Sequence, residues 1–500
     1  MKPMAEVNLE IDGRALRVPA GTTVLKAAER LGIVIPRFCF HPAFEPEGSC
    51  RMCLVEVEGL PKLDLACSTI VREGMKVRTS TPKVLQARRD VLEFLLADHP
   101  LDCPICDKAG ECLLQEYYDA HGRYPSAFLE PKEKKAKKVP LGKALLLDRE
   151  RCVLCSRCVR FLRKVTKTGE LGIFERGVRS EVGLDNGAEV LNNYSGNLVD
   201  ICPVGAITDT DFRFKTRVWF LKNGRTVCPR CGRGCAIIVQ SVCGYPLSGN
   251  RRKVYRIVPA ENPEVNGYWI CDRGRYAVPE IEDGRAEAVS AKAGGMAGTA
   301  APLSWDDALR ALTADIRGAA APGRPPRLGV VLTSFLTNEE LEAAQKIFVQ
   351  ALGVTAVHFA DPAAGEPDGL LMTADRTPNR RGAEALGFTL TQPDLGALAG
   401  AVDVLLVFGP HLLDRVPLEE AARALAGIGR TWLLTPRKSS LDGLADVVLP
   451  TALPQEKSGS FTNVDGLRQH FEPALRPPRG SRPEGRILAD LAAALGMKLE

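Results

Sequence analysis

The placement of the cysteines constrains this chain more than any other feature of its sequence. All sixteen lie between Cys39 and Cys271, and residues 272–500 contain none. The N-terminal residues have no apolar stretch that would predict a secretory signal, so we expect a cytosolic chain. In that reducing compartment so many thiols indicate metal binding rather than disulfides. The cysteines fall into four groups, each with its own spacing.

The first group has the spacing C-x10-C-x2-C-x13-C and consists of Cys39, Cys50, Cys53 and Cys67. The loop between its first two members contains Gly48, which allows the backbone to wrap closely around a ligand. One close pair with outlying single cysteines is similar to plant-type [2Fe–2S] ferredoxins, although their C-x4-C-x2-C spacing differs. The alternative is a structural zinc site, because four thiolates also suit zinc.

The third group along the chain is the most specific. Cys152, Cys155 and Cys158 follow one another at two-residue intervals, and Cys202-Pro203 lies downstream. Bacterial ferredoxins use C-x2-C-x2-C-x3-C-P, in which the fourth cysteine serves a second cluster. Here Leu162 stands at that fourth position, and Asn192, Ser195 and Leu198 stand where the second triplet is expected. We infer that one cluster of an ancestral pair is lost, and we expect Cys152, Cys155, Cys158 and Cys202 to hold the remaining [4Fe–4S] cluster rather than zinc.

The fourth group combines C-x2-C-x3-C with a distant cysteine. Its members are Cys228, Cys231, Cys235 and Cys271. We expect another [4Fe–4S] cluster at this group, and a zinc ribbon is the alternative on spacing alone.

The second group has only three cysteines, Cys103, Cys106 and Cys112, although an iron–sulfur cube needs four protein ligands. Two residues are candidates for the fourth. His99 stands four positions before Cys103, and imidazole is a competent iron ligand, as in Rieske centres. The other candidate, Cys243, is the single cysteine outside the groups and lies far away along the chain, where a lone buried cysteine is an ordinary small hydrophobe. We predict His99, whose neutral ring would raise the reduction potential.

Around these groups the sequence predicts several α+β and α/β domains. Residues 5–20 form a hairpin turning at Asp12-Gly13, a helix follows with Thr22 as its N-cap and Gly32 as its stop, and a second helix begins at Thr81-Pro82. The expected boundaries are 1–80 for a β-grasp [2Fe–2S] domain, 81–125 for a small helical His/Cys segment, 126–143 for a basic linker that is a solvated connector rather than a binding patch, 144–216 for a bacterial-ferredoxin-like domain, 217–277 for a further cluster domain, 278–302 for a flexible joint and 303–500 for a doubly wound α/β domain.

The composition and the sequence patterns argue against three further functions: nucleic-acid binding, membrane spanning and nicotinamide binding. The chain is 45% hydrophobic and 25% charged with a net charge of +5, which is typical of a globular protein. No aromatic–basic stripe predicts nucleic-acid binding. The apolar run around residues 396–413 is interrupted by Asp403 and His411 and predicts a buried strand rather than a membrane span. No GxGxxG fingerprint follows a strand, so we expect no nicotinamide site.

The whole array resembles the 75-kDa type iron–sulfur subunit family of bacterial NADH:quinone oxidoreductase, respiratory complex I. Its order is H-x3-C-x2-C-x5-C behind a [2Fe–2S] domain, then C-x2-C-x2-C with Cys-Pro, then C-x2-C-x3-C with a distant cysteine. The match covers about residues 5–277. The C-terminal part is similar to the molybdopterin-oxidoreductase domain that this family carries without molybdenum; it is much shorter than in longer members, so we expect a truncated remnant. "SGSFTNVDG", residues 458–466, is a family-like element within it.

The resemblance implies an electron relay with one [2Fe–2S] and three [4Fe–4S] clusters and no molybdenum, FMN or NAD on this chain. Electrons would come from FMN on an NADH-binding subunit that has its own [2Fe–2S] partner. They would enter at the [2Fe–2S] centre and pass through the Cys152 cube and then the His99 cube. They would leave to a ferredoxin-like two-cluster subunit and reach quinone beside the peripheral quinone-site subunits, while the whole complex moves protons. The Cys228 cube would lie off this path. The chain would belong to the peripheral arm, on the cytoplasmic side of the inner (plasma) membrane, touching the membrane only through the complex.

Three other classes of protein are alternatives. A molybdopterin-dependent formate dehydrogenase-like large subunit shares the array but uses a cysteine or selenocysteine as a molybdenum ligand in its C-terminal part, and iron-only hydrogenases need further downstream cysteines. No cysteine follows Cys271, although a serine or an aspartate remains an alternative molybdenum ligand. A scaffold without metal would have little reason to keep so many reactive thiols. The arginines between the ligands, Arg151, Arg157, Arg160, Arg230 and Arg233, are expected to tune potentials, to dock acidic partners or to form a solvated rim.

Overall fold

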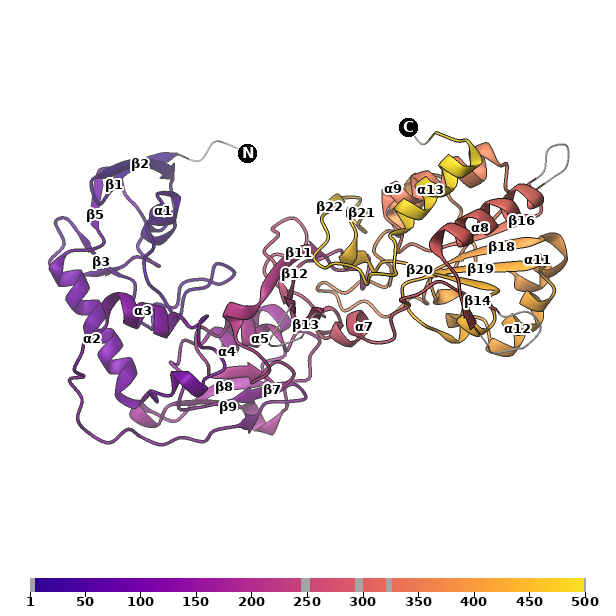
Figure 1. Ribbon diagram of the computed structural model, residues 1–500. Coiled ribbons are helices and arrows are strands. Elements are labelled where there is room, and N and C mark those ends of the chain that lie inside the picture. The colour runs from indigo at the N-terminus through magenta and orange to yellow at the C-terminus, as the bar shows by residue number, and fades with distance from the viewer. Residues whose placement is uncertain (1–4, 244–251, 293–299, 321–325, 499–500) are drawn as a thin grey trace. The chain divides into compact units, whose positions relative to one another are not determined.

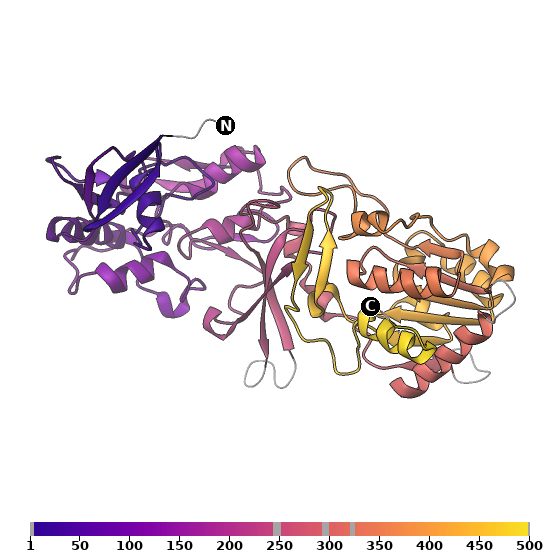
Figure 2. The ribbon, with the colours of Figure 1, turned by 90° about the horizontal axis from the view of Figure 1, so that it is seen from above.

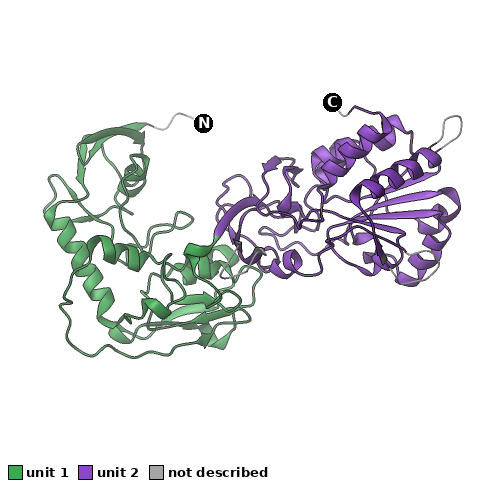
Figure 3. Ribbon diagram, viewed as in Figure 1, with its two compact units in different colours: residues 1–221 green, residues 222–500 purple. Residues whose placement is uncertain are grey.

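The computed structural model describes residues 5–243, 252–292, 300–320 and 326–498. The chain forms two compact units, residues 1–221 and 222–500, which are coloured separately in Figure 3. No helix in these described ranges is long and apolar enough to cross a membrane.

The first unit begins with a small mixed sheet, in the order β2-β1-β5-β3-β4, with one helix packed on it (Figure 1). Its elements are β1 Glu6–Ile11, β2 Arg14–Pro19, α1 Val24–Arg30, β3 Leu54–Val57, β4 Asp64–Leu65 and β5 Met75–Arg78. The predicted hairpin is confirmed, because β1 and β2 pair antiparallel around Asp12 and Gly13, both at positive φ. Apolar residues of the sheet and of α1 share one buried core, which is the arrangement of a β-grasp domain.

The first helix corrects one prediction. The N-cap of α1 is Thr23 rather than Thr22, since Thr23 is extended and its hydroxyl accepts from Lys26 N at 3.3 Å. The Thr22 hydroxyl instead donates to Pro19 O at 2.6 Å and closes the turn after β2. The predicted stop is confirmed, because Gly32 follows the helix at φ +72°.

The rest of the first unit consists of short elements that present cysteines. They are α2 Pro82–Asp98, α3 Leu113–His121, β6 Val139–Pro140, β7 Leu145–Leu147, α4 Arg157–Phe161, β8 Leu171–Phe174, β9 Glu181–Leu184, α5 Asn197–Ile201 and β10 Ile207–Asp209. Helix α2 starts as predicted, because the Thr81 hydroxyl accepts from Val84 N and Pro82 occupies the first turn. It ends directly before His99.

The lysine-rich stretch between α3 and β6 is mostly exposed, as expected of a connector. It is nevertheless tied down at three points. Lys132 donates to the last carbonyls of α2, Lys135 donates to Ser180 O at 2.8 Å, and Lys137 pairs with Glu150 at 2.7 Å. The connector therefore holds α2 near the segment that precedes the Cys152 group.

The second unit begins with an antiparallel sheet in the order β11-β12-β13, followed by two short helices. These elements are β11 Lys222–Val227, β12 Ala236–Cys243, β13 Arg252–Pro259, α6 Asp272–Arg275 and α7 Val278–Glu282. A late hairpin, β21 Gly459–Thr462 with β22 Arg468–Phe471, contains most of the "SGSFTNVDG" element, and β22 lies beside β11 (Figure 2).

The larger part of the second unit is a doubly wound sheet in the order β15-β14-β20-β19-β18-β16-β17. Its elements are β14 Ser290–Lys292, β15 Ala300–Pro302, α8 Trp305–Ala319, β16 Leu328–Leu332, α9 Asn338–Ala344, β17 Ala356–Phe359, α10 Arg380–Ala385, α11 Leu395–Ala401, β18 Val404–Phe408, α12 Leu418–Ala426, β19 Arg430–Thr435, β20 Val447–Pro450 and α13 Glu484–Leu495. Strands β16 to β20 run parallel, as the strand–helix–strand pattern predicts.

Alternation along β18 shows why the sheet needs helices on both faces. Leu406 and Phe408 join the core under α8, α9 and α13, whereas Leu405 and Val407 join the core under α11 and α12. The run that includes β18 is thus the buried strand that the sequence predicts, and all five residues of β18 are buried.

The expected flexible joint is more ordered than predicted at its ends. Strands β14 and β15 lie within residues 278–302, pair with each other, and join the doubly wound sheet through β20. The glycine-rich centre of that stretch, residues 293–299, lies outside the described residues. Backbone hydrogen bonding to a sheet edge therefore extends the α/β domain to about residue 290.

A buried ion pair fixes the start of this domain. Both terminal nitrogens of Arg285 donate to the carboxylate of Glu456 at 2.7 Å, and the two side chains are 4% and 0% exposed. We expect Arg285→Met to lower the free energy of unfolding of the second unit by about 3–5 kcal/mol, because Glu456 is left buried and unneutralised by its partner. Urea unfolding followed by circular dichroism measures this. Arg310→Met is the matched control, since the Arg310 side chain is 73% exposed; equal midpoints for the two variants would contradict the prediction.

Candidate metal centres

The first cysteine group surrounds the loop between α1 and β3 and the turn after β4. Cys39, Cys53 and Cys67 are buried and Cys50 is partly exposed. Gly48 has φ +68° and Arg51 φ +56°, so the loop folds back on itself between Cys39 and Cys53. A hydrogen bond with the Cys50 thiol lowers the pKa of Cys39 to about 5 and raises that of Cys50. Cys53 and Cys67 form a second such pair. The thiols therefore contact one another in two pairs, Cys39 with Cys50 and Cys53 with Cys67, and their sharing of one centre stays a prediction.

The third group encloses a small cavity of about 20 Å³, which Cys152, Cys155, Cys158 and Cys202 all line. Leu154 and Ser156 adopt left-handed conformations that turn the loop around this space before α4 begins. Helix α5 ends at Cys202 and brings it to the same cavity. Burial raises the pKa of Cys152 to about 12 and that of Cys155 to about 11, and the other thiolates of the group add to both shifts. Metal coordination would relieve this repulsion, because the ligands are thiolates.

The positions of the missing second triplet have become ordinary structural residues. Leu198 is fully buried in α5, and the Asn192 side chain donates to Glu170 at 2.9 Å.

The second group lines a cavity of about 310 Å³, with His99, Cys103, Cys106 and Cys112 all at its wall. His99 Nδ1 is buried and has no hydrogen-bond partner. Burial lowers the pKa of His99 to about 4, so the ring is neutral and able to donate a lone pair to a metal at neutral pH. A buried nitrogen without a partner is costly in a folded protein, and a bound metal would satisfy it.

The absence of a side chain at Gly205 leaves space for the Cys106 thiol at the wall of this cavity. A Cβ atom at this position would overlap Cys106 Sγ and would lie 3.3 Å from Lys108 Cβ. The residue follows Cys202-Pro203, so the third group supplies part of the wall of the second. The alternative fourth ligand, Cys243, ends β12, and its side chain lies outside the described part of the structure.

The fourth group lies between the β11–β12 hairpin and α6. Cys228, Cys231, Cys235 and Cys271 are all buried, and Cys228 N donates to Cys235 O at 2.8 Å. Burial raises the pKa of Cys271 to about 11, with a further contribution from Cys231. A Cβ at Gly274 would lie 3.1 Å from Cys228 Sγ and 3.8 Å from Cys271 Sγ, so a glycine leaves these two thiols accessible from the same side.

The fit of iron–sulfur clusters to these four groups rests on the chemistry of the donors. In the described ranges, no three histidine, cysteine or carboxylate side chains are gathered closely enough to hold one metal ion. What the groups offer is crowded buried thiols, an imidazole nitrogen without a partner and glycines where a side chain would block a sulfur atom. These features suit thiolate and imidazole ligation of iron–sulfur clusters.

The three arginines between the ligands of the first unit do not form a solvated rim. Arg151, Arg157 and Arg160 are only 4%, 8% and 7% exposed, which excludes a role for them on a docking surface of this unit. Arg151 pairs with Asp102 beside the second group. In the second unit Arg230 and Arg233 are partly exposed and pair with Glu280 and Asp465.

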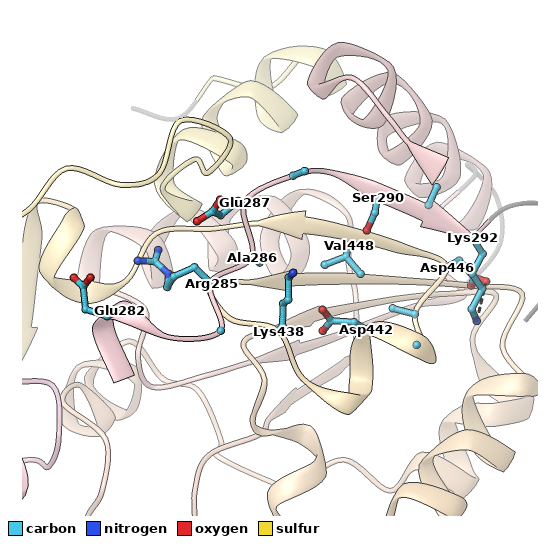
Figure 4. A pocket seen from close by; sticks show the side chains of 15 residues that line it. Glu282, Arg285, Ala286, Glu287, Ser290, Lys292, Lys438, Asp442, Asp446 and Val448 are labelled. Carbon is cyan, nitrogen blue, oxygen red and sulfur yellow. Dashed lines mark ion pairs between the residues drawn. The ribbon is translucent and has the colours of Figure 1, made fainter. Parts of the chain in front are cut away.

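A larger cavity of about 680 Å³ lies along β14 and β20 of the second unit (Figure 4). Two of its basic residues have acidic partners: Arg285 pairs with Glu456, and Lys292 lies 3.7 Å from Asp446. It has no cysteine or histidine among its lining residues, so it lacks the donor types of the four cysteine groups.

Comparisons with known families divide the chain in the same way. Residues 4–82 match a 2Fe-2S iron-sulfur cluster binding domain and residues 88–125 the NADH-ubiquinone oxidoreductase-G iron-sulfur binding region. Residues 142–208 match the ferredoxin-like domain of NADH-quinone oxidoreductase subunit 3. Residues 221–283 match a molybdopterin oxidoreductase Fe4S4 domain, and residues 440–494 match molybdopterin oxidoreductase. The chain is thus a modular iron–sulfur protein.

Curated relatives give the family. The G-type subunit of NADH-quinone oxidoreductase from Streptomyces coelicolor is 40% identical over 71% of this chain and 40% of its own length. A second G-type subunit, from Rhizobium meliloti, is 35% identical over 89% of this chain and 49% of its own length, and the mitochondrial 78 kDa subunit of NADH-ubiquinone oxidoreductase from Neurospora crassa is 34% identical over 86% and 54%. The chain belongs to this family of G-type NADH-quinone oxidoreductase subunits, and its matched part spans about half the length of these relatives.

Among solved structures, a chain of an NAD+-reducing [NiFe]-hydrogenase in the H2-reduced state matches 43% of this chain and 92% of its own length. The identity is 32% and the TM-score is 0.39.

Proposed function

We propose that this chain is the iron–sulfur electron-relay subunit of an NADH:quinone oxidoreductase. It would carry electrons from FMN on a partner subunit toward quinone, in a complex that couples this transfer to proton translocation. The main support for this proposal is that the three cysteine groups of the first unit are joined by direct contacts rather than spread over separate surfaces. A relay needs such proximity, because electrons move between centres that lie close together.

Two sets of contacts provide this proximity. Helix α4 follows the Cys152–Cys155 loop, and its Arg160 and Arg157 donate to the carbonyls of Cys39 and Phe40 in the first group. On the other side of the third group, Pro203 O accepts from Leu113 N at 2.9 Å, which ties the residue after Cys202 to the residue after Cys112. The third group therefore contacts both of the others, which supports the order first, third, second.

In this proposal the chain binds one [2Fe–2S] and three [4Fe–4S] clusters, which supply one-electron chemistry when bound. Four sets of residues would hold them, namely Cys39, Cys50, Cys53 and Cys67 for the [2Fe–2S] cluster; His99, Cys103, Cys106 and Cys112; Cys152, Cys155, Cys158 and Cys202; and Cys228, Cys231, Cys235 and Cys271. Most of these thiols are buried, whereas Cys50 and Cys152 are partly exposed and Cys103 is exposed.

The proposed partners follow from the relay. They are an FMN- and NADH-binding subunit with its [2Fe–2S] partner as donor, a ferredoxin-like two-cluster subunit as acceptor and the peripheral subunits around the quinone site. The chain would lie in the peripheral arm on the cytoplasmic side of the membrane. Molybdenum, FMN and NAD would be absent from it.

A molybdopterin enzyme is the alternative, and the second unit argues against it. The crevice at the carboxyl ends of β16 and β18, where open α/β sheets bind ligands, is a cavity of about 120 Å³. Cofactor pockets are typically about 300–1,000 Å³. The crevice is thus smaller than a typical cofactor pocket, and no cysteine after Cys271 is present to bind molybdenum.

Reduction by NADH tests the proposed role. The purified chain, anaerobic and loaded with its clusters, is mixed with NADH alone and with NADH plus the FMN-binding subunit. We expect electron paramagnetic resonance signals of reduced clusters only in the second mixture. Reduction by formate without a flavin subunit, or no reduction by NADH with that subunit present, would contradict the relay.

A further inference from the structure

Arg157 has an unusual environment for a charged side chain. It is 8% exposed, and it lies at the start of α4, between Cys155 and Cys158. Its Nη2 donates to Phe40 O at 2.6 Å and its Nη1 donates to Ile201 O at 3.2 Å. Phe40 follows Cys39 of the first group, and Ile201 precedes Cys202 of the third. One guanidinium therefore links a ligand-bearing segment of each centre.

The charge of Arg157 has no counter-ion among the described residues. The structure gives it no ion pair, and its Nε is buried without a hydrogen-bond partner. Burial lowers the pKa of Arg157, and the groups that oppose this shift are Cys155, Cys202, Tyr117 and Cys39. An isolated buried charge is strongly unfavourable. Clusters held by four thiolates carry net negative charge and would supply the missing compensation.

Arg160, one turn further along α4, differs in this respect. It donates to Cys39 O and to Ser156 Oγ, but its Nε also lies 3.8 Å from a carboxylate oxygen of Glu47. Part of its charge is offset by that partner. Arg157 has no such carboxylate partner in the part of the chain that the structure describes, so its positive charge is not offset by an ion pair and can act on both centres.

We propose that Arg157 is a positioning residue shared by two clusters, which fixes the backbone beside one ligand of each and raises the reduction potentials of both. The potentials rise because each reduction adds negative charge close to a fixed positive charge in a poorly solvated interior. This inference rests on the proposed function, since it requires clusters at the first and third groups.

The test is a redox titration of the full chain, purified anaerobically and followed by electron paramagnetic resonance, with iron counted for each variant. Arg157→Met should keep its iron and lower the equilibrium constant for reduction at least tenfold at both centres, which is about 59 mV for one electron. Arg157→Lys keeps the charge but not the two-point contact, and should lower it less. The His99 and Cys228 centres should not move. Arg163→Met is the matched control, because Arg163 is an exposed arginine shortly after α4.

Potentials in Arg157→Met equal to those of the control would overturn the inference, and so would a shift at only one of the two centres. If Arg157→Met loses iron, Arg157→Gln is titrated instead, because glutamine can still donate to one carbonyl while it carries no charge; unchanged potentials in that variant would overturn the inference equally. Absence of clusters from the unaltered chain would contradict the proposed function itself, and the inference would fall with it.

Discussion

Replacing Gly205 by alanine is expected to remove the cluster of the second group and leave the other three in place. The added Cβ would occupy the space of Cys106 Sγ, and Lys108 Cβ stands 3.3 Å away on the same side, so the methyl group has no free space beside the thiol. The thiol would have to turn away from the cavity that His99, Cys103 and Cys112 share. Iron content should fall from about 14 to about 10 atoms per chain.

The matched control is Gly318→Ala. Gly318 lies within α8, and nothing stands within 4 Å of a Cβ at that position. Alanine also has the higher helix propensity, so this variant should keep all its iron. Full iron in Gly205→Ala together with an unchanged signal from the His99 centre would show that Cys106 does not ligate from the position seen here.

Substitutions at His99 should separate the two candidates for the fourth ligand. His99→Ala removes the nitrogen that is buried without a partner, and should lose the cluster of the second group. His99→Cys should retain that cluster with one more negative charge, and its equilibrium constant for reduction should fall at least tenfold, or about 59 mV. Iron analysis and redox titration of both variants measure these effects.

Cys243→Ala is the corresponding control at the other candidate. We expect it to keep all four centres, because the cavity of the second group already has four donors at its wall without Cys243. Loss of this cluster in Cys243→Ala, with retention in His99→Ala, would reverse the assignment.

The ligand groups themselves could be predicted from sequence because metal chemistry fixes residue type and spacing. C-x2-C-x2-C around Cys155 leaves little choice of structure, and the structure places Cys202 at the same cavity. Helix ends were predictable for a similar reason. Thr81-Pro82 combines a side-chain cap with a residue that needs no donor, whereas Thr22 and Thr23 are chemically equal, and only the turn after β2 decides between them.

The residues around the ligands could not be predicted, because their roles depend on contacts between distant segments. Gly205 is one glycine among 46, and only the fold places it against Cys106. Arg157 directly precedes Cys158 in a basic stretch, for which a solvated rim was one of the expectations, yet its guanidinium is buried and donates to the carbonyls of Phe40 and Ile201. Strands β14 and β15 could not be predicted from a sequence rich in alanine and glycine, because these segments form strands by pairing with each other and with β20 at the edge of the sheet.

The proposed relay requires one [2Fe–2S] and three [4Fe–4S] clusters on this chain and no active site of its own. The decisive measurement is the content of iron and molybdenum per chain in anaerobically purified protein. We expect about 14 iron atoms and no molybdenum. Zinc in place of about four irons would turn one group into a structural site. Stoichiometric molybdenum would contradict the relay and make the chain a molybdopterin enzyme.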